Sequence, residues 1–206
     1  MPNNRSVYII SLCVVFFAVS IRSHAQTEKG APESRGEYAM VAYISGGLGY
    51  YATKAGTPVA VTAKTSKLGP ASTIRILWHP DHLLRVGFET GYMTFYSYTI
   101  KDSTGKSGKS SLTGIPLLIV ASMPVTARLN AFFGTGFFSM STNLDYAGQK
   151  TAAHKFGVGW MLAASYVHPL NKRMGLGTEL KWMDAAETGD ASVCVQLQLV
   201  WKFLTW

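Results

Sequence analysis

Apolar and polar residues alternate with a period of two along most of the chain after residue 37. In residues 84–100 the even positions are mainly aliphatic or aromatic, whereas the odd positions include Arg85, Gly87, Glu89 and Gly91. This period places successive side chains on opposite faces of a β-strand. Such alternation, or a short apolar run, predicts eight strands at residues 38–50, 71–79, 84–100, 113–122, 126–139, 156–166, 174–182 and 193–203.

The segments between these strands alternate in length. Residues 80–83, 123–125 and 168–172 are short and rich in Pro or Asn, whereas residues 51–70, 101–112, 140–153 and 184–191 are longer and polar. Short turns at one end and long loops at the other are typical of transmembrane β-barrels. The predicted fold class is therefore all-β, an eight-stranded antiparallel up-and-down transmembrane barrel over residues 38–206.

The N-terminus has the pattern of a cleavable signal peptide. Arg5 supplies a positive charge, residues 7–21 are uncharged and mostly apolar, and Ser23 and Ala25 provide the small residues of a cleavage site. A 15-residue helix spans only roughly 22 Å, too short for the hydrocarbon core. We expect a signal peptide at residues 1–25, a short periplasmic segment at 26–37, and export from the cytoplasm.

The apolar strand face is predicted to meet lipid, because a soluble barrel would carry its polar residues outside. Aromatic residues on this face fall near both strand ends, as expected of girdles at two membrane interfaces. The predicted girdle residues are Trp78, Tyr166, Trp201 and Phe203 at the short-turn end, and Tyr96, Tyr98, Phe137 and Trp182 at the long-loop end.

The polar face is predicted to line a narrow interior, where strand glycines leave space for larger side chains. The charged residues on this parity are Arg75, Arg85, Glu89, Arg128, Glu179 and Lys181. Because a buried unpaired charge is costly, opposite charges should pair there. With Phe132, Met93 and Met161, the six charges predict a plugged lumen.

Several segments together resemble a known family. They are the signal ending SHAQ, the strand IPLLIVASMP, the GxG pairs at 134–136, 157–159 and 175–177, and the closing strand VCVQLQLVWKF. The chain resembles the small outer-membrane barrels of the OmpA/OmpX kind, and more closely the PorT-like outer membrane protein beta-barrel domain. The resemblance implies a Gram-negative outer membrane, two periplasmic termini and recognition of the closing strand by the barrel-insertion machinery.

Composition and charge limit the kinds of partner that we expect. With 48% hydrophobic and 15% charged residues the chain is not disordered. The formal net charge is +8, but the lysines are scattered without interleaved aromatics, so nucleic acid is not expected as a partner. Outer-membrane lipid is the expected surrounding, and lysines in the long loops are expected to meet lipopolysaccharide phosphates.

Candidate chemistry is sparse. The repeated GKS at 105–110 lacks the spacing of a phosphate-binding loop, and His79, His82 and His168 are the only histidines near the short turns. We therefore predict no catalytic residue, no cofactor and no metal site, and a structural, envelope-integrity or surface-interaction role with an unidentified envelope protein as a possible partner. The alternatives are a membrane-embedded lipid-acyl enzyme using His154 with Ser139 or Ser141, and a soluble periplasmic lipocalin-like barrel that binds a ligand.

Overall fold

The computed structural model describes residues 38–53, 62–80, 84–101, 107–146, 149–186 and 189–206, so the predicted signal peptide and periplasmic segment lie outside it. The described strands are β1 (Ala39–Tyr51), β2 (Thr62–Ser66), β3 (Leu68–His79), β4 (Arg85–Lys101), β5 (Ser107–Pro124), β6 (Leu129–Tyr146), β7 (Gln149–Pro169), β8 (Met174–Ala185) and β9 (Asp190–Thr205). Only Lys67 separates β2 from β3, and both pair with β4. They act as one broken strand, so the fold has the eight strands that the sequence predicts.

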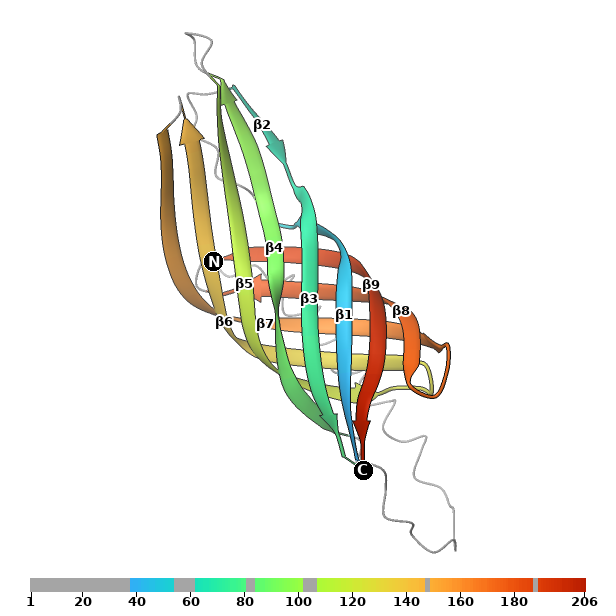
Figure 1. Ribbon diagram of the computed structural model, residues 1–206. Helices are drawn as coiled ribbons and strands as arrows, with labels where there is room; N and C mark the ends of the chain where they lie inside the picture. The colour runs from blue at the N-terminus through green and yellow to red at the C-terminus, as the bar shows by residue number, and fades with distance from the viewer. Residues whose placement is uncertain (1–37, 54–61, 81–83, 102–106, 147–148, 187–188) are drawn as a thin grey trace, which may run out of the picture. The chain divides into compact units, whose positions relative to one another are not determined.

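The sheet closes on itself. From β3 to β9 each strand pairs antiparallel with the next, and β1 closes the sheet by pairing with both β3 and β9 (Figure 1). Main-chain hydrogen bonds between Tyr38 and Trp206, both 3.0 Å long, extend the β1–β9 seam to the end of the chain. Closure satisfies main-chain donors and acceptors around the barrel wall and leaves no sheet edge there.

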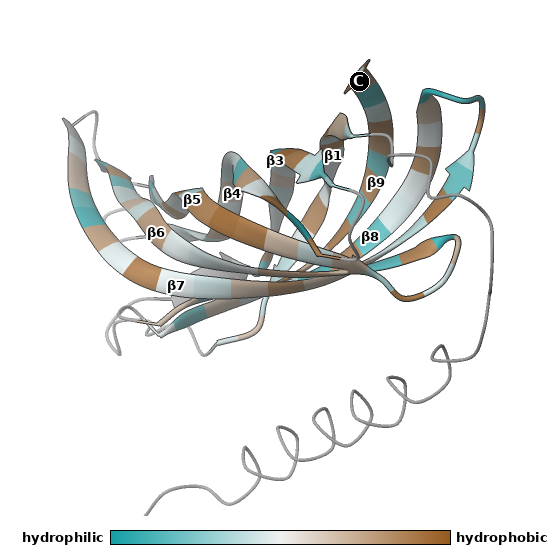
Figure 2. Ribbon diagram, turned by 90° about the horizontal axis from the view of Figure 1, so that it is seen from below, coloured by the Kyte–Doolittle hydropathy of each residue, from teal (hydrophilic) through white to brown (hydrophobic). Residues whose placement is uncertain are grey.

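Burial alternates along the strands as the sequence pattern predicts. On β9, Leu197 is 67% exposed whereas its neighbour Gln198 is fully buried. The outer surface carries large apolar side chains on every strand of the barrel wall, and apolar and polar residues alternate along the ribbons in Figure 2. Among the described residues, no helix is long and apolar enough to cross a membrane.

Three strands run well beyond the predicted limits, and one short strand was not predicted. Residues 107–112, 140–146 and 149–153, expected to be loop, are paired strand, and 62–66 pairs with β4. We call the assembly of residues 62–66, 97–101, 107–112, 141–146 and 149–155 the protruding sheet. On β7, only Trp160–Pro169 pair with β8, so the protruding sheet continues beyond the last residue that β8 pairs with (Figure 1). Main-chain hydrogen bonds hold it together, and these need no apolar alternation, so its sequence is indistinguishable from polar loop.

A β-bulge in β4 changes which aromatic side chains face outward at the long-loop end. Met93 lies opposite Gly114, but Tyr96 lies opposite Leu112, which shares the same inward parity of β5. The register shift between Thr94 and Tyr96 turns the strand over. Tyr96 therefore packs against the core, with its ring 5.0 Å from that of Tyr51, and Tyr98 stacks on Tyr96. The outward placement expected for Tyr96 and Tyr98 does not hold.

Candidate functional site

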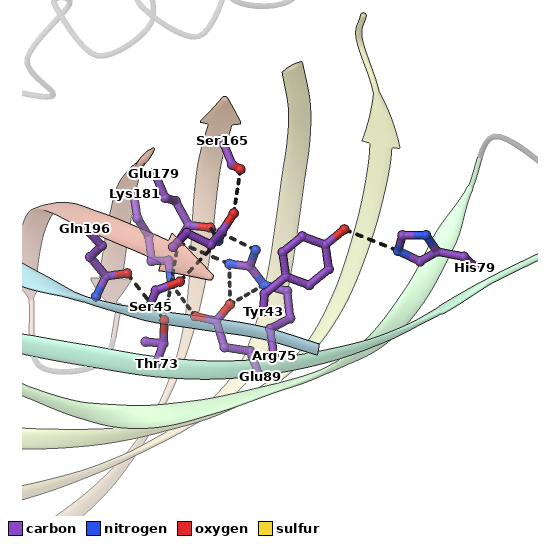
Figure 3. A network of polar contacts seen from close by, with 11 residues as sticks. Tyr43, Ser45, Thr73, Arg75, His79, Glu89, Ser165, Glu179, Lys181 and Gln196 are labelled. Carbon is purple, nitrogen blue, oxygen red and sulfur yellow. Dashed lines mark hydrogen bonds and ion pairs between the residues drawn. The ribbon is translucent and has the colours of Figure 1, made fainter. Parts of the chain in front are cut away.

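Four charged side chains meet in the barrel interior. Arg75 of β3 contacts Glu89 of β4 at 2.5 Å and Glu179 of β8 at 2.9 Å. Lys181 of β8 contacts the same two carboxylates at 2.7 and 2.8 Å. All four side chains are at most 1% exposed, and the two positive and two negative charges balance (Figure 3). We call this group the interior charge cluster.

Strand geometry explains how these four residues converge. Arg75 and Glu89 are direct partners in the β3–β4 register, so their side chains leave the sheet together. Glu179 and Lys181 are two residues apart on β8 and share a face. The bond from Arg75 to Glu179 joins β3 to β8, which are separated in the sheet by β1 and β9. The cluster therefore spans the bore rather than lying along one wall.

Neutral polar residues complete the hydrogen bonding of the cluster. Gln198 donates to Glu179 at 2.7 Å and to Ser45 at 3.1 Å, and it accepts from Ser165 at 2.6 Å. Lys181 donates to Thr73 at 2.9 Å, and Thr73 donates in turn to Gln196 at 3.3 Å. Among the described residues, only Ser122 has a buried side-chain polar atom without a partner. Every buried side-chain polar atom of this network therefore has a hydrogen-bond partner within the protein.

Packed apolar side chains flank the cluster on both sides. Toward the short turns, the Arg75 guanidinium lies 4.0 Å from the centre of the Phe132 ring, and Tyr43 packs edge-on against Phe132. Toward the loops, a second layer consists of Met93, Phe95, Phe138, Met140 and Met161, all of them buried.

Strand glycines make room for this packing because they have no side chain. A Cβ at Gly159 would lie 2.6 Å from the Phe138 ring and 2.3 Å from the carbonyl oxygen of Asp184. At Gly134 it would lie 3.1 Å from Met161. Both the bulky side chains and the neighbouring backbone therefore need these glycines, in line with the space-making role expected from the sequence.

Two of the six charges expected in the lumen lie outside the interior charge cluster. Arg85 sits near the start of β4 and donates to Asn130 at 3.1 Å. Arg128 lies in the turn before β6, is exposed, and donates to the hydroxyl of Tyr166 at 3.2 Å. The prediction for Arg128 was wrong because it assumed the alternation of a strand, whereas Arg128 lies in a turn. The structure thus brings together Arg75, Glu89, Glu179 and Lys181, and leaves both arginines outside the cluster.

The other predicted girdle residues lie on the outer face. Trp78, Tyr166, Trp182 and Trp201 are exposed, and Phe203 is half-buried with its ring 5.8 Å from that of Trp201. Two further aromatic residues, which the strand pattern did not predict, join them at the short-turn end. Tyr38 stacks between Trp78 and Trp206, with both ring separations 6.3 Å. Only the pairing of the chain ends brings these rings together, so the strand pattern could not reveal them.

The candidate catalytic residues do not form a site. The β6–β7 register places Ser141 opposite His154, but no hydrogen bond links their side chains in the described part of the chain. Ser139 lies opposite Phe156. Within the same ranges no three His, Cys, Asp or Glu side chains gather as metal ligands; His79 bonds to Tyr43, and His82 is outside the described residues.

Comparison with known proteins supports the fold. No protein-family model matches the chain, and no curated protein matches its sequence. The attachment invasion locus protein Ail of Yersinia pestis superposes with a TM-score of 0.52 at 8% identity, covering 82% of this chain and 99% of Ail. The outer membrane protein OprG of Pseudomonas aeruginosa gives 0.50 at 12% identity, covering 82% and 98%. The chain therefore has the fold of a small outer-membrane β-barrel, and the predicted fold class is confirmed.

Proposed function

We propose that this protein is a sealed barrel of the Gram-negative outer membrane, which displays the protruding sheet outside the cell and has a structural or surface-interaction role. The observation that carries this proposal is the interior charge cluster, which crosses the bore and is fully hydrogen-bonded. Both termini of the barrel lie at the short-turn end, which we assign to the periplasm. Lipid surrounds the exposed apolar belt.

The sealed lumen argues against a porin. Arg75 and Lys181 are each held by two carboxylates, so opening a water path would separate buried ion pairs. A charge that stays buried without its partner is strongly unfavourable, so the paired, closed arrangement is favoured. The layers containing Phe132 and Phe138 close the bore on either side of the cluster.

The protruding sheet supplies the surface for interaction. Its residues 142–145 and 151–155 are exposed in succession, so both faces meet water. A hollow of about 370 Å³ lies on it, lined by residues that include Lys109, Asn143, Asp145 and Thr151. Lys109 would also reach anionic lipopolysaccharide groups. A polar, ordered platform of this kind suits contact with an envelope or surface partner.

Single-channel recording tests the sealed lumen. We expect the purified protein in planar bilayers to show no openings above background, with an open porin as the positive control. The Lys155→Gln variant, altered far from the bore, should behave identically. Large, steady, nanosiemens-scale openings from the monomer would contradict the proposal and favour a porin.

Surface display is tested by an epitope tag inserted between Tyr146 and Gln149, at the tip of the β6–β7 hairpin. We expect antibody to label intact cells. A second tag, inserted in the turn between Pro169 and Met174, should become accessible only after the outer membrane is permeabilised. The reverse order of labelling would show that the assigned orientation is wrong.

A further inference from the structure

A second hollow opens at the short-turn end of the barrel. Its volume is about 320 Å³, and its lining comes from the short-turn ends of every strand except β2 and from the turns after β5 and β7. The cationic lining residues are Arg85, Lys172, Arg173 and Lys202, and no described lining residue is an Asp or Glu. We call this hollow the turn-end pocket.

The pocket is a closed end rather than a channel entrance. Tyr43 lines it, and the hydroxyl of Tyr43 lies 3.3 Å from Nε2 of His79. The Tyr43 ring packs against Phe132, which in turn lies against Arg75 of the interior charge cluster. A ligand entering from this side would therefore meet a sealed floor and remain at the mouth.

The wall that carries the outermost cations is held in place. The side chain of Asn171 accepts hydrogen bonds from the backbone NH groups of Arg173 and Met174, both at 2.8 Å. The backbone NH of Lys202 donates to the carbonyl of Arg173 at 2.8 Å, which ties the β7–β8 turn to β9. Arg173 and Lys202 are thus fixed next to each other along one side of the pocket.

The cations of this pocket differ from those of the interior charge cluster. Arg75 and Lys181 each have two carboxylate partners, but Arg85 bonds to a neutral amide. The side chains of Lys172 and Arg173 make no hydrogen bond or ion pair with any residue that the structure describes. A concave site lined by one sign of charge concentrates counter-ions.

From this geometry we propose that the turn-end pocket binds a phosphate group. Arginine presents a planar fork of donors that matches phosphate oxygens in two-pronged bonds, and lysine adds a compact charge. Several cations around one small volume favour a multiply charged oxyanion over a single carboxylate. The group could come from a phospholipid headgroup or from a soluble phosphate ester, because both offer the same oxygens.

Calorimetry with inorganic pyrophosphate tests the site on the full mature protein in a zwitterionic detergent. We expect saturable binding at one site, weakened at least tenfold in Arg85→Gln and in Arg173→Gln. Arg173 is exposed on a turn, so its variant should fold even if loss of the Arg85–Asn130 bond impairs the other. Lys155→Gln removes the same charge from the opposite end of the barrel and should stay within twofold of the unsubstituted protein.

Nanodiscs separate the two sources of phosphate. If a lipid headgroup occupies the pocket, phosphatidylglycerol nanodiscs should abolish pyrophosphate binding that phosphatidylcholine nanodiscs preserve. Equal binding in both would assign the pocket to a soluble phosphate ester. Absence of saturable binding in the unsubstituted protein, or an equal loss in Lys155→Gln, would overturn the proposal.

Discussion

The barrel wall and the protruding sheet are built from the same strands but follow different rules. In the wall, β6 alternates buried Phe132 and Phe138 with exposed Phe133 and Phe137. Further along the same strand, residues 142–145 are all exposed, although the pairing with β5 and β7 continues unbroken. Period-two alternation therefore indicates that the two faces of a sheet meet different surroundings. A strand whose two faces both meet water shows no such alternation.

The two regions also differ in what a polar side chain contributes. In the wall, polar groups are buried and depend on each other, as in the bonds of Gln198 to Ser45, Glu179 and Ser165. In the protruding sheet, exposed polar groups can exchange any partner for water. Matched substitutions in the two regions should consequently differ widely in their effect on stability.

The largest difference is expected for a carboxylate. Glu89→Ala should lower the free energy of unfolding by about 3–5 kcal/mol, because it leaves Lys181 and Arg75 short of a buried partner. Asp145→Ala in the protruding sheet should change it by less than about 0.5 kcal/mol. Urea unfolding of the protein folded into lipid vesicles measures both, and equal losses would show that the interior charge cluster does not stabilise the barrel.

A new charge on the outer face should cost somewhat less. Leu197→Arg introduces a cation on the exposed apolar belt and should cost about 2–4 kcal/mol if the site lies near the middle of the bilayer. Thr142→Arg adds the same side chain to the protruding sheet, where water solvates it, and should be close to neutral. The same unfolding assay compares them. Similar costs at the two positions would place Leu197 outside the hydrocarbon.

The smallest effect is expected for a single methyl group. Gly159→Ala would bring a Cβ within 2.3 Å of the Asp184 carbonyl oxygen, so overpacking should destabilise the barrel by about 1–3 kcal/mol. Gly46→Ala, on the outward parity of β1, meets nothing within 4 Å and should be neutral. The midpoint of thermal unfolding in detergent is a sufficient measure. A stable Gly159→Ala variant would mean that β7 and β8 can separate at this point.

The linear pattern of residues predicts the eight strands of the barrel wall, their inward and outward faces, and the charged residues available to the interior. These features depend on the local geometry of a strand and on the contrast between its two faces, so a linear pattern carries them. Arg75, Glu89, Glu179 and Lys181 were all identified in this way, as were the outward Trp78 and Trp201.

Which of these residues come into contact depends on how the strands are arranged in the closed barrel. The contact of Arg75 with Glu179 depends on strand tilt and stagger around the closed barrel, and no segment of sequence specifies these. The bulge before Tyr96 shifted the parity by one residue without a sequence signal that the alternation could register. Two further features could not be predicted for a related reason. The protruding sheet is held together by main-chain pairing, which leaves no side-chain pattern. The turn-end pocket forms from turns and strand ends that closure of the barrel brings together.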